Sequence, residues 1–487
     1  MTPSEWLADS PVTGLLWSVS ALILTLQLAQ NSVYLAHLLR ALPEFFSARA
    51  RSARLREWWL LTSEATPPIS LLVPGYNEEA TIVESLRSML TLRYPEYEIL
   101  VVNDGSKDAT LARLIEAFDL KPVHRAAPGR TSYQPIRGIY ANPALPNLLV
   151  IDKQNGGKAD ALNAAMDLAR HPYVCSVDAD SLLDADALLR AVRPFIDAPD
   201  TTLAVGGTIR VVNGCQVHAG RILEVRPPRH WLELFQTVEY LRAFLLTRMA
   251  WTRSRAVTII SGAFGIFRRD VVLELGGYEH GTVGEDMELV VRLHRWAGEQ
   301  GREGQVLHVP DPVCWTEVPS SLQVLSRQRT RWQRGLCETL WRHRRMIGNP
   351  KYGSVGLVAL PGFVLFDVVG PVLELLGLLL VPLCTLLGIL NVEFFIAYCA
   401  VVFGFGLCLS LGSMILAEFS LQHHRRVRDL LWLGFGAIAE NFGFRQINSW
   451  WRLQGIWQFL KKKKGWGEMT RRGFSQAKPP ASGGPPG

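Results

Sequence analysis

Two carboxylates one residue apart, Asp178 and Asp180, follow the apolar run YVCSV that begins at Tyr173. Side chains two positions apart on a strand point to the same side of a sheet, and hard divalent cations prefer carboxylate oxygens. The pair therefore indicates either a metal site or an ordinary strand-end turn, because Asp is also a common turn residue. Taken alone the turn is the simpler interpretation, so the choice depends on what else lies at the same edge.

Two other polar clusters follow apolar runs earlier in the chain, Tyr-Asn-Glu at 76–78 and Asp-Gly-Ser at 104–106. In sheets of parallel strands, ligands bind beyond the carboxyl ends of the strands. Three clusters of this kind therefore indicate one shared site. For a nucleotide-diphosphate sugar, Tyr76, Glu78 and Asp104 are the groups expected to meet the nucleotide.

A lysine, Lys158, follows two glycines in the stretch NGGKADALN and precedes a run with helical spacing. The first backbone N–H groups of a helix attract phosphate, and an ammonium group adds to this attraction. Lys158 is therefore predicted to meet the donor diphosphate. The alternative is a solvated charge at a helix start, which the two glycines make the weaker interpretation.

Two adjacent acids, Glu285 and Asp286, follow Gly284 and begin the stretch EDMELVVRLHR, which has a helical apolar stripe. An attacking hydroxyl needs a general base, and a carboxylate here could serve as one. Acidic residues are also common as caps at the start of a helix. The local sequence leaves both interpretations open.

The stretch QRTRWQRG at 328–335 combines Gln, Arg and Trp on a predicted amphipathic helix just before a long apolar zone. One interpretation is a basic helix lying on a membrane surface. In the other, Arg331 contacts the departing diphosphate and Trp332 stacks on a sugar, with Gln328 in the same group.

The elements that must position these residues alternate between strand and helix. The strand-like runs are ISLLVP, YEILVV, NLLVID and YVCSV, and the helical runs between them are EATIVESLRSML, ATLARLIEAF and GKADALNAAMDLAR. This alternation predicts a parallel α/β sheet with helices on both faces. The Pro- and Gly-rich segment 124–147 is predicted to form a long loop across the rim.

Apolar segments flank this domain. Residues 14–39 contain no charged residue, and as a helix they would be about 39 Å long, more than the ~30 Å hydrocarbon layer. We therefore expect a membrane anchor rather than a removable signal. Residues 372–390 and 394–416 are two further expected spans, whereas 357–370 is short and interrupted by Asp367 and prolines and is expected to be interfacial.

A last segment, 429–460, is ambiguous because Glu440, Asn441 and Arg445 lie within it. A polar path at membrane depth and a surface amphipathic helix are both compatible with these residues. Lys and Arg cluster beside the spans in a pattern that places them all on one side. We expect a multi-pass protein of the plasma (bacterial inner) membrane with a cytoplasmic α/β domain.

The composition fits this organisation. Hydrophobic residues make up 48% of the 487 residues, and the net charge of +7 is explained by the basic clusters beside the spans, so no nucleic-acid partner is expected. The seven cysteines are scattered without metal-type spacing, which predicts free thiols in a reducing compartment.

Taken together, the motifs DGS, GGK…ALN, DAD, GED and QRTRW have the order and approximate spacing of the processive family 2 glycosyltransferases. This family includes bacterial cellulose synthase, hyaluronan synthase, chitin synthase and poly-N-acetylglucosamine synthase. The chain resembles them over about residues 69–340, with membrane helices on both sides. The resemblance implies an α/β GT-A (Rossmann-like) catalytic domain plus an α-helical transmembrane region.

The resemblance also implies an inverting transfer that uses a UDP-sugar, a divalent metal (Mg²⁺ or Mn²⁺) and a growing glycan or lipid acceptor. In that case Asp178 and Asp180 would handle the nucleotide and metal, and Asp286, beside Glu285, would be the base. The segment IISGAFGIFRR resembles the family's acceptor segment, with Ser261, Gly262 and Ala263 at positions that cellulose synthases fill with Cys-Gly-Ser. The family often has Thr-Glu-Asp where this chain has Gly-Glu-Asp, so the acceptor stays open.

Three alternatives to a polysaccharide synthase coupled to export stay open. They are transfer of a single sugar to a polyprenyl-phosphate or other lipid, a non-enzymatic membrane scaffold or receptor, and nucleotidyl transfer.

The expected organisation is an N-terminal transmembrane helix (1–40), a cytoplasmic basic linker (41–68), the GT-A domain (69–320), interfacial amphipathic helices with the Gln-x-x-Arg-Trp motif (321–370), a C-terminal transmembrane region (371–465) and a disordered tail (466–487).

Overall fold

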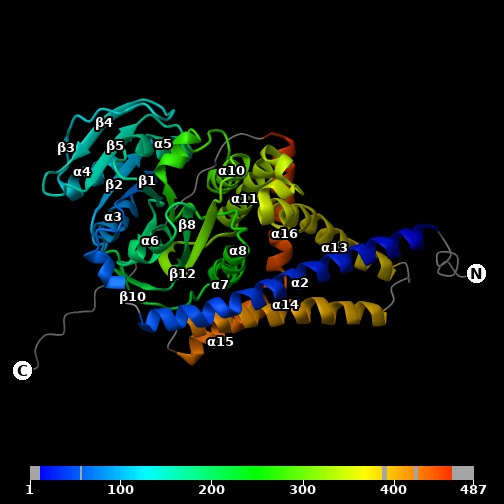
Figure 1. The fold of residues 1–487 in the computed structure, drawn as a ribbon. Helices are drawn as coiled ribbons and strands as arrows, with labels where there is room; N and C mark the ends of the chain where they lie inside the picture. The colour runs from blue at the N-terminus through cyan, green and yellow to red at the C-terminus, as the bar shows by residue number, and fades with distance from the viewer. Residues whose placement is uncertain (1–10, 55–56, 387–391, 422–425, 463–487) are drawn as a thin grey trace, which may run out of the picture.

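A computed structural model describes residues 11–54, 57–386, 392–421 and 426–462. An α/β domain built on one ten-stranded sheet lies against a group of long helices (Figure 1). The expected tail, 466–487, lies outside the described residues.

The sheet has the strand order β3-β4-β5-β2-β1-β6-β11-β8-β12-β7. Its strands are β1 (Ile69–Gly75), β2 (Tyr97–Asn103), β3 (Lys121–Pro122), β4 (Ile136–Ala141), β5 (Leu148–Lys153), β6 (Tyr173–Ser176), β7 (Ser181–Leu183), β8 (Thr202–Val211), β11 (Gly265–Arg268) and β12 (Gln305–Thr316). The four predicted strands are the parallel group β5-β2-β1-β6, which confirms that part of the expectation. The sheet as a whole is mixed, however, because β11 runs antiparallel to both of its neighbours. A separate hairpin joins β9 (Gln216–His218) and β10 (Arg221–Glu224).

The prediction of a long loop over 124–147 was wrong in part. Within it, β4 pairs antiparallel with β5 and also with β3. Ile139 in β4 is buried, and it lies opposite Ile151 of β5. The apolar stretch IRGIYA therefore extends the sheet beyond β5, although prolines and glycines dominate the composition around it.

Helices cover both faces of the sheet, as predicted. One face carries α3 (Ile82–Leu90), α4 (Thr110–Phe118) and α6 (Ala187–Asp197), and the other carries α5 (Lys158–Leu168), α9 (Arg269–Glu274) and α10 (Glu285–Glu299). The alternation of side chains along β1 explains this division, since Leu71 and Val73 pack into the first core and Leu72 into the second. All three are fully buried. A strand covered on both faces reads as a continuous apolar run, which is why β1 was recognisable.

The remaining helices lie beyond the sheet. They are α2 (Pro11–Arg54), α7 (Trp231–Leu241), η2 (Arg242–Thr247), α8 (Arg248–Arg253), α11 (Leu322–Arg342), α13 (Gly370–Leu386), α14 (Val392–Leu421), α15 (Val427–Ala439) and α16 (Phe444–Leu460), with short 3₁₀ turns η1 (Glu57–Leu61), η3 (Arg344–Met346) and η4 (Pro350–Tyr352). Helix α2 packs along α14, and the two run side by side below the α/β domain (Figure 1). Helix α2 continues to Arg54, so the first part of the expected linker is helical.

Two helical stretches among the described residues are long and apolar enough to cross a membrane, Ser18–Arg40 and Val355–Leu386. In the second stretch, residues 357–370 are continuous with the helix that follows instead of forming a separate segment, and their expected interfacial location stays a prediction. The π-helical turns η5 (Val355–Ala359) and η6 (Phe363–Val369), joined by α12 (Leu360–Gly362), carry the helix directly into α13. Local π-helical turns absorb irregularities without ending a helix, so the prolines do not interrupt it.

The ambiguous segment 429–460 forms two helices, which meet at Gly443, a residue with φ of 92°. Helices α15 and α16 have 13 and 17 residues, fewer than the ~20 needed to span a bilayer. Helix α16 packs against α11 so closely that a Cβ on Gly455 would lie 2.6 Å from the Cβ of Gln333. Polar residues of this region form ion pairs: Arg242 with Glu440, Arg445 with Glu374, and Arg452 with Asp367.

Candidate functional site

One large cavity, with a volume of about 1770 Å³, opens beyond the carboxyl ends of β1 and β6. Its walls come from the loops after these strands, from the starts of α5 and α10, and from α2, α7, α11, η6 and α16. Every residue singled out as a site candidate from the sequence lines it: Tyr76, Glu78, Asp104, Lys158, Asp178, Asp180, Ser261, Gly262, Glu285, Asp286, Gln328, Arg331 and Trp332. Residues up to 256 positions apart in the chain are thus brought to one place.

The two carboxylates Asp178 and Asp180 lie in the turn between β6, which ends at Ser176, and β7, which begins at Ser181. The expectation that their side chains share one face of a strand was therefore wrong. Both residues lie in a turn after the strand, and both also line the cavity. Asp180 is 1% exposed, whereas Asp178 is open to the cavity. The turn separates a buried carboxylate from an accessible one.

Lys158 begins α5 and lies between carboxylates. Its Nζ is 2.6 Å from Oδ1 of Asp178 and 3.6 Å from Oε1 of Glu285. Burial alone would lower the pKa of Lys158, but the charges of Asp178, Glu285 and Asp286 outweigh burial and raise it. The alternative of a solvated helix-start charge is thereby excluded, and the ammonium group stays charged at neutral pH.

Gly262 is the reason why Lys158 can reach this position. A Cβ on Gly262 would lie 2.5 Å from the Nζ of Lys158. The acceptor-like segment SGA thus touches the donor-side lysine. A side chain at position 262 would displace the ammonium group of Lys158 from its position in the structure.

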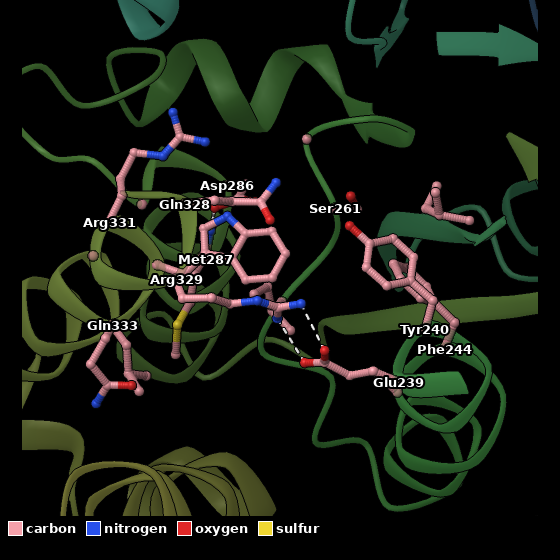
Figure 2. Close-up of a pocket in the computed structure, with 18 of the residues that line it drawn as sticks. Glu239, Tyr240, Phe244, Ser261, Asp286, Met287, Gln328, Arg329, Arg331 and Gln333 are labelled. Carbon is pink, nitrogen blue, oxygen red and sulfur yellow. Dashed lines mark hydrogen bonds and ion pairs between the residues drawn. The ribbon is translucent and has the colours of Figure 1, made fainter. Parts of the chain in front are cut away.

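Glu285 and Asp286 form the first turn of α10 after Gly284. Burial raises the pKa of the Glu285 carboxyl to about 7. The positive charge of Lys158 lowers this pKa, and the negative charge of Asp286 raises it. Oδ1 of Asp286 accepts a hydrogen bond from the backbone N–H of Met287, at 2.8 Å, and the side chain lines the cavity (Figure 2). Asp286 therefore meets both descriptions left open by the sequence, an acid at a helix start and a carboxylate facing the site.

Helix α11 is fitted against the loop that carries these acids. Glycines face each other at the contact, and a Cβ on Gly335 would lie 2.9 Å from the Cα and the N of Gly284. From one turn further along α11, Glu338 accepts hydrogen bonds from the backbone N–H of Val283 at 3.0 Å and from Thr282 Oγ1 at 3.2 Å. The helix that carries Arg331 and Trp332 is thus fixed in register with Asp286.

We expect Gly335→Ala to destabilise the protein, because the added methyl group would meet backbone atoms that have little freedom to move. Overpacking of this kind costs about 1–3 kcal/mol of unfolding free energy. The expected result is a lower apparent melting temperature of the detergent-solubilised chain. Gly404→Ala is the matched control, since a Cβ there meets nothing within 4 Å. Equal melting temperatures for the two variants would contradict the close approach.

Asp104 is buried and carries more hydrogen bonds than a free ligand-binding carboxylate would. Its oxygens accept from Nζ of Lys153 at 2.6 Å, from the backbone N–H of Gly156 at 3.0 Å and from that of Gly157 at 2.8 Å. Asp104 therefore holds the glycine loop that precedes Lys158, in addition to lining the cavity.

Lys153 was missed in the sequence, where it ends a strand-like run and reads as a solvated charge. It is fully buried and pairs with both Asp104 and Asp160. A buried lysine with two carboxylates keeps its charge compensated. Only the tertiary contacts distinguish Lys153 from a surface lysine, and the local sequence contains no sign of them.

Tyr76 and Glu78 lie in the loop after β1. Tyr76 is exposed, and the backbone N–H of Glu78 donates to Thr110 Oγ1 at 2.9 Å. Asn77 between them has φ of 56°, the left-handed region that Asn tolerates better than most residues. This loop presents the Tyr76 ring and the Glu78 carboxylate to the cavity.

The Gln-x-x-Arg-Trp residues lie on α11 as predicted. In Figure 2, Gln328 and Arg331 lie on the same side of the cavity as Asp286, and Ser261 lies across from them. Trp332 is 42% exposed. An exposed indole beside a row of polar groups is suited to stacking on a sugar ring.

Two cations near these residues were also missed. Arg329 pairs with Glu239 of α7, and Arg248 of α8 lies with its guanidinium carbon 3.7 Å from the centroid of the Phe244 ring. Burial lowers the pKa of Arg248 to about 10, and the charge of Asp286 acts in the opposite direction. Arg248 is thus a half-buried cation close enough to Asp286 to interact with its charge.

The residues of the turn also fit a divalent cation. No cluster of three or more His, Cys, Asp or Glu side chains occurs within the described ranges. Mg²⁺, however, commonly uses one or two carboxylates together with phosphate oxygens and water. Asp178 and Asp180, two carboxylates on the cavity, are a donor set of this kind.

All seven cysteines are free thiols, as expected, and none of them belongs to such a set. Cys175, Cys314 and Cys337 are buried, and desolvation raises the pKa of each thiol. These three thiols are therefore packing residues rather than nucleophiles.

Residues 70–276 match the family model described as Glycosyl transferase family 2. Poly-beta-1,6-N-acetyl-D-glucosamine synthases of Staphylococcus epidermidis and Staphylococcus aureus are each 30% identical to this chain over 275 residues, which is 56% of this chain and 56% of each relative. The chain thus spans about half the length of the relatives it matches.

A solved structure gives the same indication for the fold. The mannosyltransferase PcManGT from Pyrobaculum calidifontis, in complex with GDP-Man and Mn²⁺, is similar with a TM-score of 0.50 at 18% identity. The similarity covers 91% of this chain and 100% of that one. At this identity it concerns the fold alone, and it confirms the expected GT-A fold.

Proposed function

We propose that this chain, whose residues 70–276 form a family 2 glycosyltransferase domain related to polysaccharide synthases, builds a β-linked polysaccharide from a nucleotide-diphosphate sugar. The observation that carries this proposal is the single cavity into which both the diphosphate-binding candidates and the Gln-x-x-Arg-Trp residues project. A UDP-sugar is the donor we favour. N-acetylglucosamine is the first sugar to test, since the relatives are poly-N-acetylglucosamine synthases.

In the proposed reaction, an acceptor hydroxyl attacks the anomeric carbon of the donor from the face opposite the diphosphate. The bond from the acceptor oxygen to this carbon forms as the bond to the phosphate oxygen breaks, so the electron pair leaves with the nucleoside diphosphate. Asp286 takes the hydroxyl proton. A single displacement inverts the configuration, and an α-linked donor therefore yields a β-linked product.

Positive groups oppose the negative charge that grows on the leaving diphosphate. Lys158 is half-buried among carboxylates and faces the cavity, and Arg331 projects from α11 (Figure 2). Charges fixed in place before the reaction stabilise a transition state without reorganisation. Asp178 and Asp180 would hold Mg²⁺ or Mn²⁺, which supplies further charge neutralisation at the phosphates when bound.

The proposal includes a path for the product and a membrane location. The cavity continues from Trp332 to the helix α2, where Gln27, Asn31, Tyr34 and His37 line it. These positions recur every three to four residues, so they form one polar stripe on a helix long and apolar enough to span a membrane. A stripe of hydrogen-bonding side chains suits a carbohydrate, which supports export coupled to synthesis, with the α/β domain in the cytoplasm of a multi-pass protein.

The test is to incubate the full chain in membranes with several radiolabelled UDP-sugars and Mg²⁺ or Mn²⁺ and to size the product. A polymer from one donor is the expected result. A product of one sugar on a lipid would favour the lipid-acceptor alternative, and nucleoside-phosphate transfer would favour the nucleotidyl alternative. The scaffold alternative would gain support if no nucleotide sugar bound.

The rate of transfer is expected to fall as the pH drops from about 8 to about 6, because the pKa of Glu285 is about 7. Above this pH Glu285 is charged and pairs with Lys158, which holds the ammonium group in the cavity. Protonation of Glu285 at lower pH removes this pairing. The measurement is the initial rate against pH for the unaltered chain and for Glu285→Gln.

The variant is expected to lose the inflection near pH 7 and to react slowly at all pH values in this range. An unchanged inflection in Glu285→Gln would assign it to another group.

A further inference from the structure

Two helices from different walls of the cavity are joined by one ion pair, between Glu239 on α7 and Arg329 on α11. Nη1 and Nη2 of Arg329 each donate to a different carboxylate oxygen of Glu239, both at 2.7 Å, as the dashed lines in Figure 2 show. Arg329 is buried, and both side chains line the cavity. Paired contacts of this geometry fix the orientation of both groups as well as their distance.

Arg329 has a second contact, on its own helix. Its guanidinium carbon lies 4.6 Å from the ring centroid of Trp332, three positions along α11. A cation over an indole face favours one ring orientation, by about 0.5–2 kcal/mol depending on burial. Arg329 therefore orients the Trp332 ring. Because Trp332 is 42% exposed, the ring remains open to the cavity.

The same ion pair also sets the opposite wall. Tyr240 and Phe244 follow Glu239 along α7 and η2, and in Figure 2 they lie across the cavity from Arg329. The ion pair therefore fixes the spacing between α7 and α11, whose residues Tyr240 and Trp332 both line the cavity. Aromatic rings beside polar groups are suited to contact with a sugar ring.

We propose that Glu239 is a positioning residue for the acceptor: through Arg329 it holds the Trp332 ring and the spacing between α7 and α11, in the part of the cavity that receives the terminal sugar of the growing chain. This inference rests on the proposed glycosyltransferase function. Glu239 pairs with Arg329 on α11, whereas Lys158 pairs with Asp178 on the nucleotide side, so removal of the Glu239 carboxylate should affect acceptor binding and leave nucleotide binding intact.

The first experiment compares Glu239→Gln with the unaltered full chain in detergent or nanodiscs. The probes are UDP with Mn²⁺ for the donor side and a β-linked N-acetylglucosamine tetramer for the acceptor side, both by titration calorimetry. We expect tetramer binding to weaken about tenfold, the effect of 1.4 kcal/mol, while UDP binding changes less than about twofold. In activity assays, transfer to the tetramer should fall relative to hydrolysis of the donor by water.

The matched control is Glu299→Gln, which breaks another Arg–Glu pair, with Arg295 at 2.8 Å, on the exposed side of α10 away from the cavity. It is expected to leave both titrations unchanged. If Glu239→Gln behaves like this control, or if it weakens UDP and tetramer binding equally, the positioning role is contradicted.

Charge-reversal variants distinguish the effect of losing the ion pair from the effect of changing either side chain alone. Glu239→Arg and Arg329→Glu alone place like charges together, and each should weaken tetramer binding more than Glu239→Gln does. The double variant Glu239→Arg/Arg329→Glu restores an opposite pair and should recover at least about fivefold over either single reversal, although the cation on Trp332 is lost. Strict additivity of the two single effects would overturn the proposal.

The two hypotheses fail in different ways. Tetramer binding that depends on Glu239 without any sugar transfer by the unaltered chain would support the positioning role and contradict the proposed function. Transfer by the unaltered chain with no dependence on Glu239 would do the reverse.

Discussion

Asp286→Asn is expected to lower sugar transfer by about 10²- to 10⁴-fold, the usual contribution of a general base, while binding of UDP with Mn²⁺ persists. The carboxylate faces the cavity from the first turn of α10 and would accept the proton of the attacking hydroxyl. An amide of nearly the same shape cannot accept that proton. The measurements are initial rates with a radiolabelled UDP-sugar and UDP titrations on the same preparation.

The control for this prediction is Asp270→Asn, because Asp270 also lies in the first turn of a helix, α9, and is mostly exposed, beside Arg268. It should leave transfer nearly unchanged. A helix-cap role for Asp286 would appear instead as a shared loss of stability and UDP binding. Full turnover in Asp286→Asn would sink the base assignment.

The central strands could be predicted because local pattern and global fold agree there. The runs at β1, β2, β5 and β6 are continuous and apolar, as strands buried on both faces must be, and polar residues lie at the end of each strand or follow it. Because ligands bind at the carboxyl ends of parallel strands, the candidate residues that follow these strands could be assigned to one site from the sequence. All of them line the cavity.

The limits of the prediction lie where composition and pattern conflict. Segment 124–147 is dominated by turn-forming residues, yet the six residues of β4 find a partner strand in β5. Likewise, prolines in the segment after Val355 suggested an interruption, whereas π-helical turns keep the helix continuous into α13. In both cases a tertiary partner or a local adjustment outweighs the intrinsic preference of the residues.

The residues that hold the site were not predictable from one sequence. Glu239 and Arg329 are 90 positions apart, and each resembles an ordinary charge on an amphipathic helix. Lys153 reads as a surface lysine, although it is fully buried between two carboxylates. Their roles come from pairing across elements, and pairing leaves no periodic signal in the sequence.

Removal of divalent cations with EDTA is expected to abolish transfer, and Mn²⁺ or Mg²⁺ should restore it. We expect Asp180→Asn to raise the Mn²⁺ concentration for half-maximal rate by at least about tenfold, since even residues that only support metal ligands have effects of this size. The measurement is the initial rate against the concentration of free Mn²⁺. Cys215→Ser, at a free thiol outside the cavity, is the control and should leave this dependence unchanged.

Lys158 makes this prediction specific to the present geometry. Its Nζ is 2.6 Å from Oδ1 of Asp178, a carboxylate that would also face the metal, so the cation and the ammonium group compete for it. Lys158→Met should therefore bind Mn²⁺ at least as tightly as the unaltered chain. Transfer should nevertheless fall by about 10²-fold or more, because a fixed charge opposing the leaving diphosphate is lost. Weaker Mn²⁺ binding in Lys158→Met would show that the lysine supports the metal instead of competing with it, and transfer that survives EDTA would remove the cation from the reaction altogether.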